Sequence, residues 1–331
     1  MSLQPTASHL SPAGFSRGRS GDIDRHARFV AEIEQCYRQL GHGPFEASHR
    51  LIRLDAVTAF EESTCPEIIE RGWLKPECLT LAVPIEASGE AWFCGQPLEP
   101  GRVALIGGPR EFMFRTPHRL RLGVLLLQEE FASLTWGRAV LPARGSGRTV
   151  ARSPAELQRI SGHFASIMRL GRQLAGRGSS DDPWRARIER ELIDDLQRLV
   201  LDLMPPDDAE ICRSLNPRCA HRLVSQALDL IHAGLAEGIS VYTACAALRV
   251  SRRYLQRCFD EVLGINPAHY ILRQRVLAAR ALLVGHAGER TTVAAAATEF
   301  GFWHLGRFAH YYREMFGETP RQTLAGARPR P

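Results

Sequence analysis

Residues 307–320 read RFAHYYREMFGETP, and the same pattern occurs 53 positions earlier, at residues 254–267, as YLQRCFDEVLGINP. A glutamate, a glycine and a proline coincide in the two stretches, and aromatic or aliphatic side chains coincide at three further positions. A repeat of this kind is typical of one supersecondary unit that is used twice. The sequence therefore predicts a duplicated unit in the last third of the chain.

The first copy has the pattern of a helix-turn-helix unit. Residues 241–248 have helical spacing, a tight turn follows, and Ser251 is placed to cap a second helix over residues 251–262. The apolar residues form one internal set, so the outer face of the second helix carries Arg252, Arg253, Gln256 and Arg257. The second helix of such a unit enters the major groove, where Arg binds guanine and Gln binds adenine in bidentate fashion. We therefore predict that Ser251 and these four side chains contact DNA.

The second copy is predicted to read bases less than the first. Its helices are expected at residues 292–299 and 304–316, and the offset between the copies changes from 52 before the turn to 53 after it. The second turn is therefore one residue longer. Because Leu305 and Gly306 have no hydrogen-bonding side chain, we expect this copy to contact phosphates and thymine methyl groups more than base edges. Its outward positions, all predicted to contact DNA, are His304, Leu305, Gly306, Arg307 and His310.

A single helix is predicted to join the two copies. Residues 267–285 read PAHYILRQRVLAARALLVG, and at 1.5 Å per residue they span about 28 Å. Successive turns of the major groove lie about 34 Å apart. A rigid helix of this length can therefore place two recognition helices on one face of a duplex.

Charge is distributed unevenly along the chain. The formal net charge is +6, and residues 217–331 carry 15 arginines against 8 acidic residues, whereas residues 1–216 are close to neutral. A basic C-terminal third suits a polyanionic partner, although a solvated Arg-rich face would look the same. Together with the helix-turn-helix pattern, the charge predicts double-stranded DNA as the partner.

The remaining composition predicts a cytoplasmic, nucleoid-associated protein. The N-terminus has no apolar signal region, and no apolar run is long enough to span a membrane. The eight cysteines include no C-x-x-C pair and no zinc spacing, which favours reduced thiols and no metal site. Residues 1–22 are rich in Ser, Gly, Pro and Arg and are predicted to be a disordered tail.

Residues 23–150 are predicted to form a β-rich effector-sensing domain. Helical spacing occurs at residues 25–40, and short alternating or apolar runs follow from residue 45 to residue 128, as in an antiparallel sandwich or barrel. The aromatic residues of this region either line a small-molecule pocket or fill the core. Trp92 is our candidate for an effector contact.

Two amphipathic helices are predicted within residues 151–204. Residues 141–152 have the composition of a connector, Ser153 begins a capping box, and a second helix over residues 183–203 carries an apolar stripe. Two alternatives stay open for these helices, because a homodimer interface and a cover for the β domain both need such a stripe. The further predicted segments are a linker at 205–217, a DNA-binding domain at 218–325 and a tail at 326–331.

Residues 217–325 resemble the AraC/XylS family of bacterial transcription regulators. The resemblance is carried by VSRRYLQRCFDEVLGINPAHYI, by the linker LRQRVLAARALL and by FGFWHLGRFAHYYREMFGETPRQTL. It implies base contacts by Arg253, Gln256 and Arg257 in the first unit. In the second unit the matching positions are Leu305, Gly306 and His310, of which the first two depart from the polar residues of some members.

The resemblance also implies an overall architecture and partners. The expected fold class is α+β, with a cupin-like sensory domain flanked by helices and an all-α domain of two helix-turn-helix units joined by a linker helix. A transcriptional activator of this kind would respond to a small-molecule effector and contact RNA polymerase. VSRRYLQ and FGFWHLGRFA, with the run YRQLGHGPFEASHRLIRLD, are further similar to members that activate ethanolamine-utilisation operons. That similarity implies ethanolamine with adenosylcobalamin as the effector.

Two other classes of protein compete with a regulator. A metal-dependent cupin-type enzyme fused to a DNA-binding domain would need two or three histidines and a carboxylate on neighbouring strands. Between residues 42 and 128 the histidines are His42, His49 and His118, without an H-x-H pair. An architectural DNA-binding protein without an effector would have no use for so large a β domain. We therefore expect a DNA-binding regulator and not an enzyme.

Overall fold

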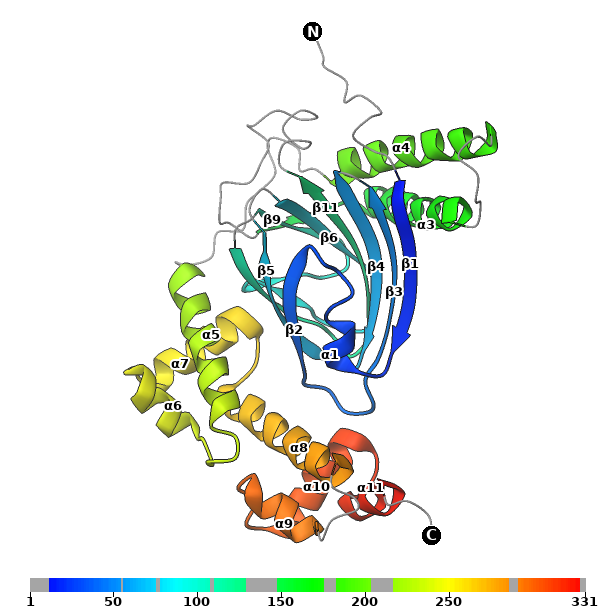
Figure 1. Ribbon diagram of the computed structural model, residues 1–331. Helices are drawn as coiled ribbons and strands as arrows, with labels where there is room; N and C mark the ends of the chain where they lie inside the picture. Colours follow the sequence, from blue (N-terminus) through cyan, green and yellow to red (C-terminus); the bar gives the residue numbers. More distant parts are fainter. Residues whose placement is uncertain are drawn as a thin grey trace.

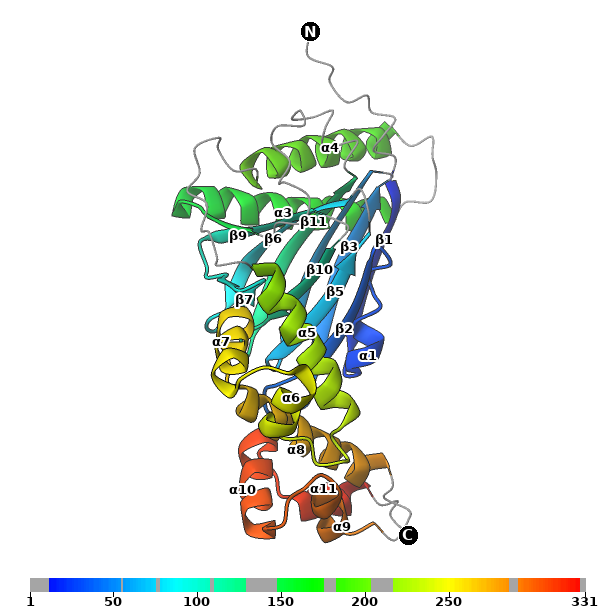
Figure 2. The ribbon, with the colours of Figure 1, turned by 90° about the vertical axis from the view of Figure 1, so that its left-hand side faces the viewer.

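The computed structural model describes residues 12–54, 56–75, 78–107, 110–128, 148–175, 183–203, 217–285 and 291–327. Strands make up most of the N-terminal part and helices make up the C-terminal part, so the predicted α+β class is confirmed at this level (Figure 1). The helices of the C-terminal part lie along one side of the strands and extend beyond them, as Figures 1 and 2 show.

The N-terminal strands form two antiparallel sheets, as the alternating sequence runs predict. The first sheet contains, in spatial order, β1 (Pro12–Ser20), β3 (Glu46–Leu54), β4 (Val57–Cys65), β11 (Leu120–Gln128), β6 (Cys78–Ala87), β9 (Arg102–Gly107) and β12 (Arg148–Ala151). The second sheet contains β2 (Ile33–Gln39), β5 (Ile68–Leu74), β10 (Arg110–Arg115), β7 (Trp92–Phe93) and β8 (Gln96–Pro97).

The first sheet is apolar on both faces, which explains continuous runs such as LGVLLL. Leu122 and Val124 of β11 face the second sheet and share a core with its phenylalanines. Leu125 of β11 belongs to a different core on the opposite face, together with helix residues such as Phe164. Gly123 lies on that opposite face, where an added Cβ would lie 2.9 Å from the Phe164 ring. The glycine therefore allows a helix to approach the sheet closely.

Helices α3 (Pro154–Ala175) and α4 (Pro183–Leu203) cover this outer face. The predicted capping box at the start of α3 is confirmed, because Ser153 N donates to Glu156 Oε2 at 2.7 Å and Glu156 N donates to Ser153 Oγ at 3.3 Å. The apolar stripe of α4 is buried against α3 within the same chain (Figure 1). Of the two alternatives for these helices, the structure therefore supports the covering role.

Three predictions for the N-terminal part are wrong. Pro12–Ser20 form β1 rather than a disordered tail, because this segment pairs antiparallel with β3; residues 1–11 lie outside the described residues. Residues 25–40, predicted to be helical, contain only the end of the short helix α1 (Ile23–His26) and then strand β2. The four-residue spacing from Ile33 to Tyr37 in β2 also fits one face of a strand. The predicted connector contains β12, which pairs with β9.

The C-terminal part is entirely helical in the described residues. Its elements are α5 (Pro217–Ala233), α6 (Val241–Leu248), α7 (Arg252–Leu263), α8 (Pro267–Gly285), α9 (Val293–Glu299), α10 (Leu305–Phe316) and α11 (Pro320–Ala327). The start of α11 was expected to be only a short turn, and residues 326–327 of the predicted tail belong to this helix. The predicted linker lies outside the described residues except for Pro217, which begins α5.

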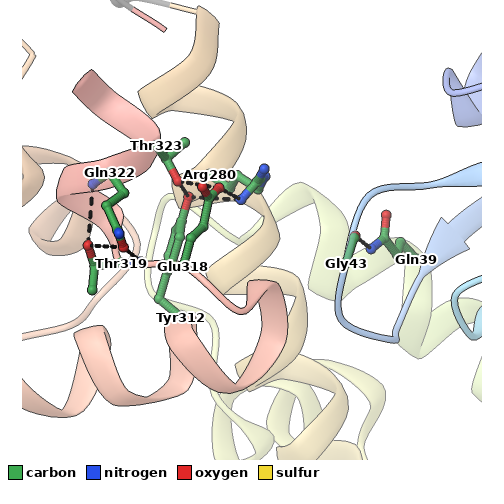
Figure 3. Close-up of polar contacts among 8 residues, drawn as sticks. All are labelled: Gln39, Gly43, Arg280, Tyr312, Glu318, Thr319, Gln322 and Thr323. Carbon is green, nitrogen blue, oxygen red and sulfur yellow. Dashed lines mark hydrogen bonds and ion pairs between the residues drawn. The ribbon is translucent and has the colours of Figure 1, made fainter. Parts of the chain in front are cut away.

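A buried polar network joins α8, α10 and α11 (Figure 3). The Tyr312 hydroxyl donates to Thr323 Oγ1 at 2.8 Å, and Thr323 Oγ1 donates to Glu318 Oε1 at 2.7 Å. Arg280 of the linker helix donates to the same glutamate oxygen at 2.6 Å. The hydrogen bond from Thr323, and to a smaller extent that from Arg280, holds the pKa of Glu318 below its usual value. The network therefore fixes the last two helices against the linker helix.

We expect Tyr312→Phe to destabilise the chain by about 1 kcal/mol, because the phenol hydroxyl is a buried hydrogen-bonding group at the centre of this network. Urea unfolding followed by circular dichroism measures the change. The matched control is Tyr311→Phe, which alters the neighbouring, half-buried tyrosine and should change the stability by less than about 0.5 kcal/mol. Equal effects of the two substitutions would contradict the role of the network.

Candidate nucleic-acid interface

The first helix pair, α6 and α7, is capped by its own side chains. Ser240 and Thr243 form a capping box at the start of α6, and α6 ends at Arg249 in the left-handed conformation with φ of 54°. Ser251 accepts a bond from Tyr254 N at 3.2 Å and so begins α7, as predicted. The buried faces of the pair include Phe259 and pack against α5 and α8. The opposite face of α7 is therefore left to solvent.

The predicted DNA-contacting residues of the first pair lie together on this exposed face. Ser251, Arg252, Arg253 and Arg257 are exposed, and Gln256 is half-buried. Gln256 Nε2 donates to Asp260 Oδ1 at 2.9 Å one turn further along the helix. The other acidic residue of α7, Glu261, also has a partner one turn earlier, the basic residue Arg257.

That second pair holds Arg257 close to the helix surface. Its Nε lies 3.2 Å from Glu261 Oε1, and its guanidinium lies 5.6 Å from the centre of the Tyr254 ring. An exposed ion pair of this spacing contributes only a few tenths of a kcal/mol. DNA can therefore displace the carboxylate at small cost.

The second helix pair repeats the backbone of the first with one insertion. Phe302 N donates to Ala297 O, and Phe308 N donates to His304 O. The corresponding bonds of the first pair lie 52 and 53 positions earlier, respectively. The extra residue therefore falls at Trp303, between the two bonds, and the predicted longer turn is confirmed.

The predicted contact residues of α10 are also exposed. His304, Leu305, Gly306, Arg307 and His310 all lie on the surface, and Leu305 is 47% exposed. His310 Nε2 lies 3.4 Å from Glu314 Oε1, in the same i to i+4 arrangement as the pair on α7. The predicted contact residues of α10 itself thus combine a histidine and an arginine with an apolar leucine and a glycine.

Trp303 is the surface residue that sequence reasoning missed. It is 79% exposed and directly precedes His304, the N-cap residue of α10, next to the predicted contact residues. The change of offset from 52 to 53 marks its position in the sequence. An exposed indole beside a recognition helix has a stacking and apolar surface that suits contact with nucleic acid.

Helices α7 and α10 lie along the same side of the C-terminal part (Figure 2). They are connected by α8, whose observed bounds match the predicted linker helix. The geometry therefore agrees with two recognition helices presented to one partner.

The second sheet contacts the helical part directly. Arg71 of β5 forms ion pairs with Glu111 of β10 and with Asp229 of α5, the latter at 2.5 Å. Ser225 of α5 donates to the same Glu111 at 2.9 Å. Apolar side chains from the outer face of this sheet, such as Met113, share the core of α5 and α7. The first helix pair, together with α5, therefore packs against the outer face of the second sheet.

The same sheet also contacts the linker helix and α10. Glu67 binds Arg273 of α8 at 2.9 Å through its second carboxylate oxygen, and Gln274 donates to the carbonyl of Gln39 at 2.9 Å. Gly43, in the loop after β2, donates its N–H to the carbonyl of Met315 at 2.5 Å (its place is shown in Figure 3). Both helix pairs are thus in contact with the β-rich part.

Trp92, the candidate for an effector contact, lies at the boundary between the β-rich part and the helical part. Its half-buried ring packs on Gly264 at the end of α7, where an added Cβ would lie 2.7 Å from the indole. Trp92 is therefore a contact between the two parts and does not line the cavity between the sheets. Its neighbour Phe93 lines that cavity instead, because side chains alternate across a strand.

The histidines of the β-rich part do not come together as metal ligands. His42 stacks on His118 with ring centres 5.0 Å apart, whereas His49 stacks on Phe29 with ring centres 4.5 Å apart. The described ranges contain no group of three His, Cys, Asp or Glu side chains suited to a metal ion. They also contain no helix that is both long and apolar enough to cross a membrane.

Comparisons with known proteins match the C-terminal third. A family described as a helix-turn-helix domain matches residues 244–326. XylDLEGF operon transcriptional activator 2 of Pseudomonas putida is 33% identical over 110 residues, which cover 33% of this chain and 67% of that protein. The HTH-type transcriptional regulator GbdR of Pseudomonas aeruginosa (strain UCBPP-PA14) is 32% identical over 103 residues, which cover 31% of this chain and 27% of that protein.

A solved structure is similar to a third of the chain. The crystal structure of a probable AraC family transcriptional regulator from Rhodopseudomonas palustris CGA009 has 37% sequence identity and a TM-score of 0.31, and the match covers 33% of this chain and 99% of that one. The first XylDLEGF operon transcriptional activator of Pseudomonas putida is matched over only 30% of its length. None of these names refers to ethanolamine, so the resemblance to ethanolamine-operon activators stays a prediction.

The exposed, capped helix α7 and the matched domain define a helix-turn-helix DNA-binding protein. The chain belongs to the AraC/XylS family of transcriptional regulators, as its sequence motifs predict. The matching proteins are named as transcriptional activators or regulators, which agrees with the expectation of a regulator.

The exposed side chains of α7 and α10 are expected to differ in how much they contribute to sequence preference. Gln256→Ala should change the base-preference profile of the protein more than Leu305→Ala, because an amide can make bidentate bonds to adenine whereas leucine offers only apolar contact. Selection of bound sequences from a random duplex library, with each variant, measures the two profiles. A larger change for Leu305→Ala would show that the ranking is wrong.

Proposed function

We propose that this protein is a sequence-specific transcriptional activator whose DNA binding is controlled by a small-molecule effector. The observation that carries the proposal is the exposed face of α7, where Arg253, Gln256 and Arg257 project from a helix with a side-chain cap. The net positive charge of the last third supports it, since phosphate neutralisation supplies much of the affinity for DNA.

In this proposal the two helix-turn-helix units have different roles in DNA binding. The first unit selects the sequence, whereas the second, with Leu305 and Gly306 at its outward positions, mainly sets the position on the duplex. Trp303 and Arg307 add contacts beside the second unit. The protein acts on chromosomal DNA, which places it in the cytoplasm at the nucleoid.

The β-rich part is the effector-sensing, cupin-like domain in this proposal. Its contacts to α5, α7, α8 and α10 support such a role, because a change in the sheets reaches both helix pairs. RNA polymerase and a second copy of this chain are the further partners that the resemblance implies. Ethanolamine with adenosylcobalamin is the effector implied by resemblance alone.

Arg257→Ala should weaken binding to the selected site by about 1–3 kcal/mol and relax the preference at one base pair, because a guanidinium bonded to guanine carries sequence information. Fluorescence anisotropy on the selected duplex and on a scrambled duplex measures both affinities. The salt dependence of binding should change little, since a base contact releases no phosphate counterion.

The matched control is Arg222→Ala, which removes an exposed arginine from α5 rather than from a recognition helix. It should leave the ratio of the two affinities unchanged. An equal loss on both duplexes with Arg257→Ala, together with a smaller salt slope, would assign this side chain to a phosphate. Failure of the unaltered chain to prefer any selected sequence would overturn the proposed function itself.

A further inference from the structure

An apolar cavity of about 40 Å³ lies between the two sheets, within the core of the β-rich part. The first sheet contributes Phe60 to its wall, and the second contributes Phe93, Phe112 and Phe114. A site for one water needs about 10–15 Å³, so the cavity has room for on the order of three heavy atoms. Two carboxyl groups, those of Glu62 and Glu70, interrupt this apolar wall.

Glu62 is held in place by two buried donors. His26 Nε2 lies 2.9 Å from Glu62 Oε1, and the Tyr37 hydroxyl donates to the same oxygen at 2.8 Å. All three residues are buried. Glu62 Oε2 makes no hydrogen bond with any residue that the structure describes. One oxygen of this carboxylate is therefore fixed, and the other is free to accept a bond.

Glu70 has no such support. Its residue is only 7% exposed, it lines the cavity from β5, and no described residue donates a hydrogen bond to its carboxyl group or forms an ion pair with it. Burial, and to a smaller extent the charge of Glu62, raise its pKa well above the usual value. Burying a carboxyl group without a donor is costly, and such groups in native proteins call for an explanation.

The strand itself explains why the carboxyl group cannot turn to solvent. Side chains of β5 alternate, so Glu70 and Leu74 face the cavity whereas Ile69 and Arg71 face the helical part. If the Glu70 side chain pointed to the other face of the sheet, it would enter the apolar core that β5 shares with α5. The unpartnered carboxyl group is therefore aimed into the cavity by the register of the sheet.

We infer that this cavity is the effector site and that it takes a small organic ammonium ion, whose N–H groups bond to Glu62 and Glu70 and whose short apolar body packs on the phenylalanine rings. The inference rests on the proposed effector control and specifies the chemical class of the effector. An ammonium ion supplies the hydrogen-bond donors and the cationic partner that the carboxyl group of Glu70 lacks among the described residues. Aromatic faces attract a desolvated cation further, through the negative charge of the ring face.

Other ligand classes fit the cavity less well. An anion would face two carboxyl groups, and a hydrated metal ion would meet an apolar wall without a third ligand in the described residues. A neutral alcohol of the same size could donate one hydrogen bond, but it would bring no positive charge to the two carboxyl groups. The comparison of an ammonium ion with its alcohol isostere is therefore the decisive test.

The test uses the full chain and two probes of equal size, ethylammonium chloride and ethanol, at constant ionic strength. Methyl-labelled protein observed by NMR reports on Leu74 and Ile106, which line the cavity. Ethylammonium should shift these methyl signals in a saturable way. Ethanol should bind at least tenfold more weakly.

Glu70→Gln should weaken ethylammonium binding at least tenfold, because the amide keeps the shape of the side chain but removes the carboxylate. The matched control is Glu86→Gln, the same change on an exposed glutamate of β6 outside the cavity, and it should bind like the unaltered chain. Ala82→Val narrows the cavity with both carboxyl groups intact and should also abolish binding. This second variant decides the matter if Glu70→Gln does not fold.

Equal binding of the two probes, normal binding by Glu70→Gln, or no binding of ethylammonium by the unaltered chain would each overturn the inference. The selection of duplex sequences is measured separately and without any probe. Sequence-specific DNA binding in the absence of ethylammonium binding would therefore reject the ligand class while leaving the DNA-binding function in place.

Discussion

The two faces of strand β5 are the constraint on which both parts of the molecule depend. Its inward side chains, Glu70 and Leu74, close the core between the two sheets. Its outward side chains, Ile69 and Arg71, join the core of the helical part and the ion pairs to α5. Because a shift of register by one residue would exchange the two sets, the strand fits only one arrangement. The sheet therefore cannot move relative to its core without also changing its contacts with the helices.

The cavity and the proposed DNA-binding surface are connected directly through strands of the second sheet. The next residue after Glu70 holds Asp229 of α5, and α5 packs on α7. Gly264, at the C-terminal end of α7, contacts Trp92. The neighbour of Trp92 in the strand, Phe93, lines the cavity. A ligand that moves the inward side chains acts on backbone that also carries the helix contacts. In the proposed effector control, the physical basis of coupling is the backbone that inward and outward side chains share, as in β5, which has one face in each core.

The sequence predicted the duplicated helical unit well, because its signals are local. Caps such as Ser251, the apolar spacing of the helices and the repeat of 53 positions each point to the same elements. The errors lie where local patterns fit two structures. Ile33 and Tyr37 are four residues apart, which is one turn of a helix and two alternations of a strand, and pairing with β5 decided between them. Trp92 and Phe93 form a two-residue strand, so only the tertiary structure shows which of them faces the cavity.

The exposed pairs of α7 and α10 indicate how the recognition surface can be selective. Arg257 pairs with Glu261 and His310 pairs with Glu314, and the second pair lies 53 positions after the first. The duplication thus repeats a predicted base-contacting side chain together with an acidic partner one turn further along the helix. In the free protein each carboxylate reduces the local positive potential, which weakens attraction to arbitrary phosphates. A base that accepts hydrogen bonds in the correct geometry replaces the carboxylate, whereas a mismatched base leaves the competing pair in place. If Arg257 and His310 contact bases as proposed, selectivity comes from an intrahelical competitor as well as from the contact with DNA.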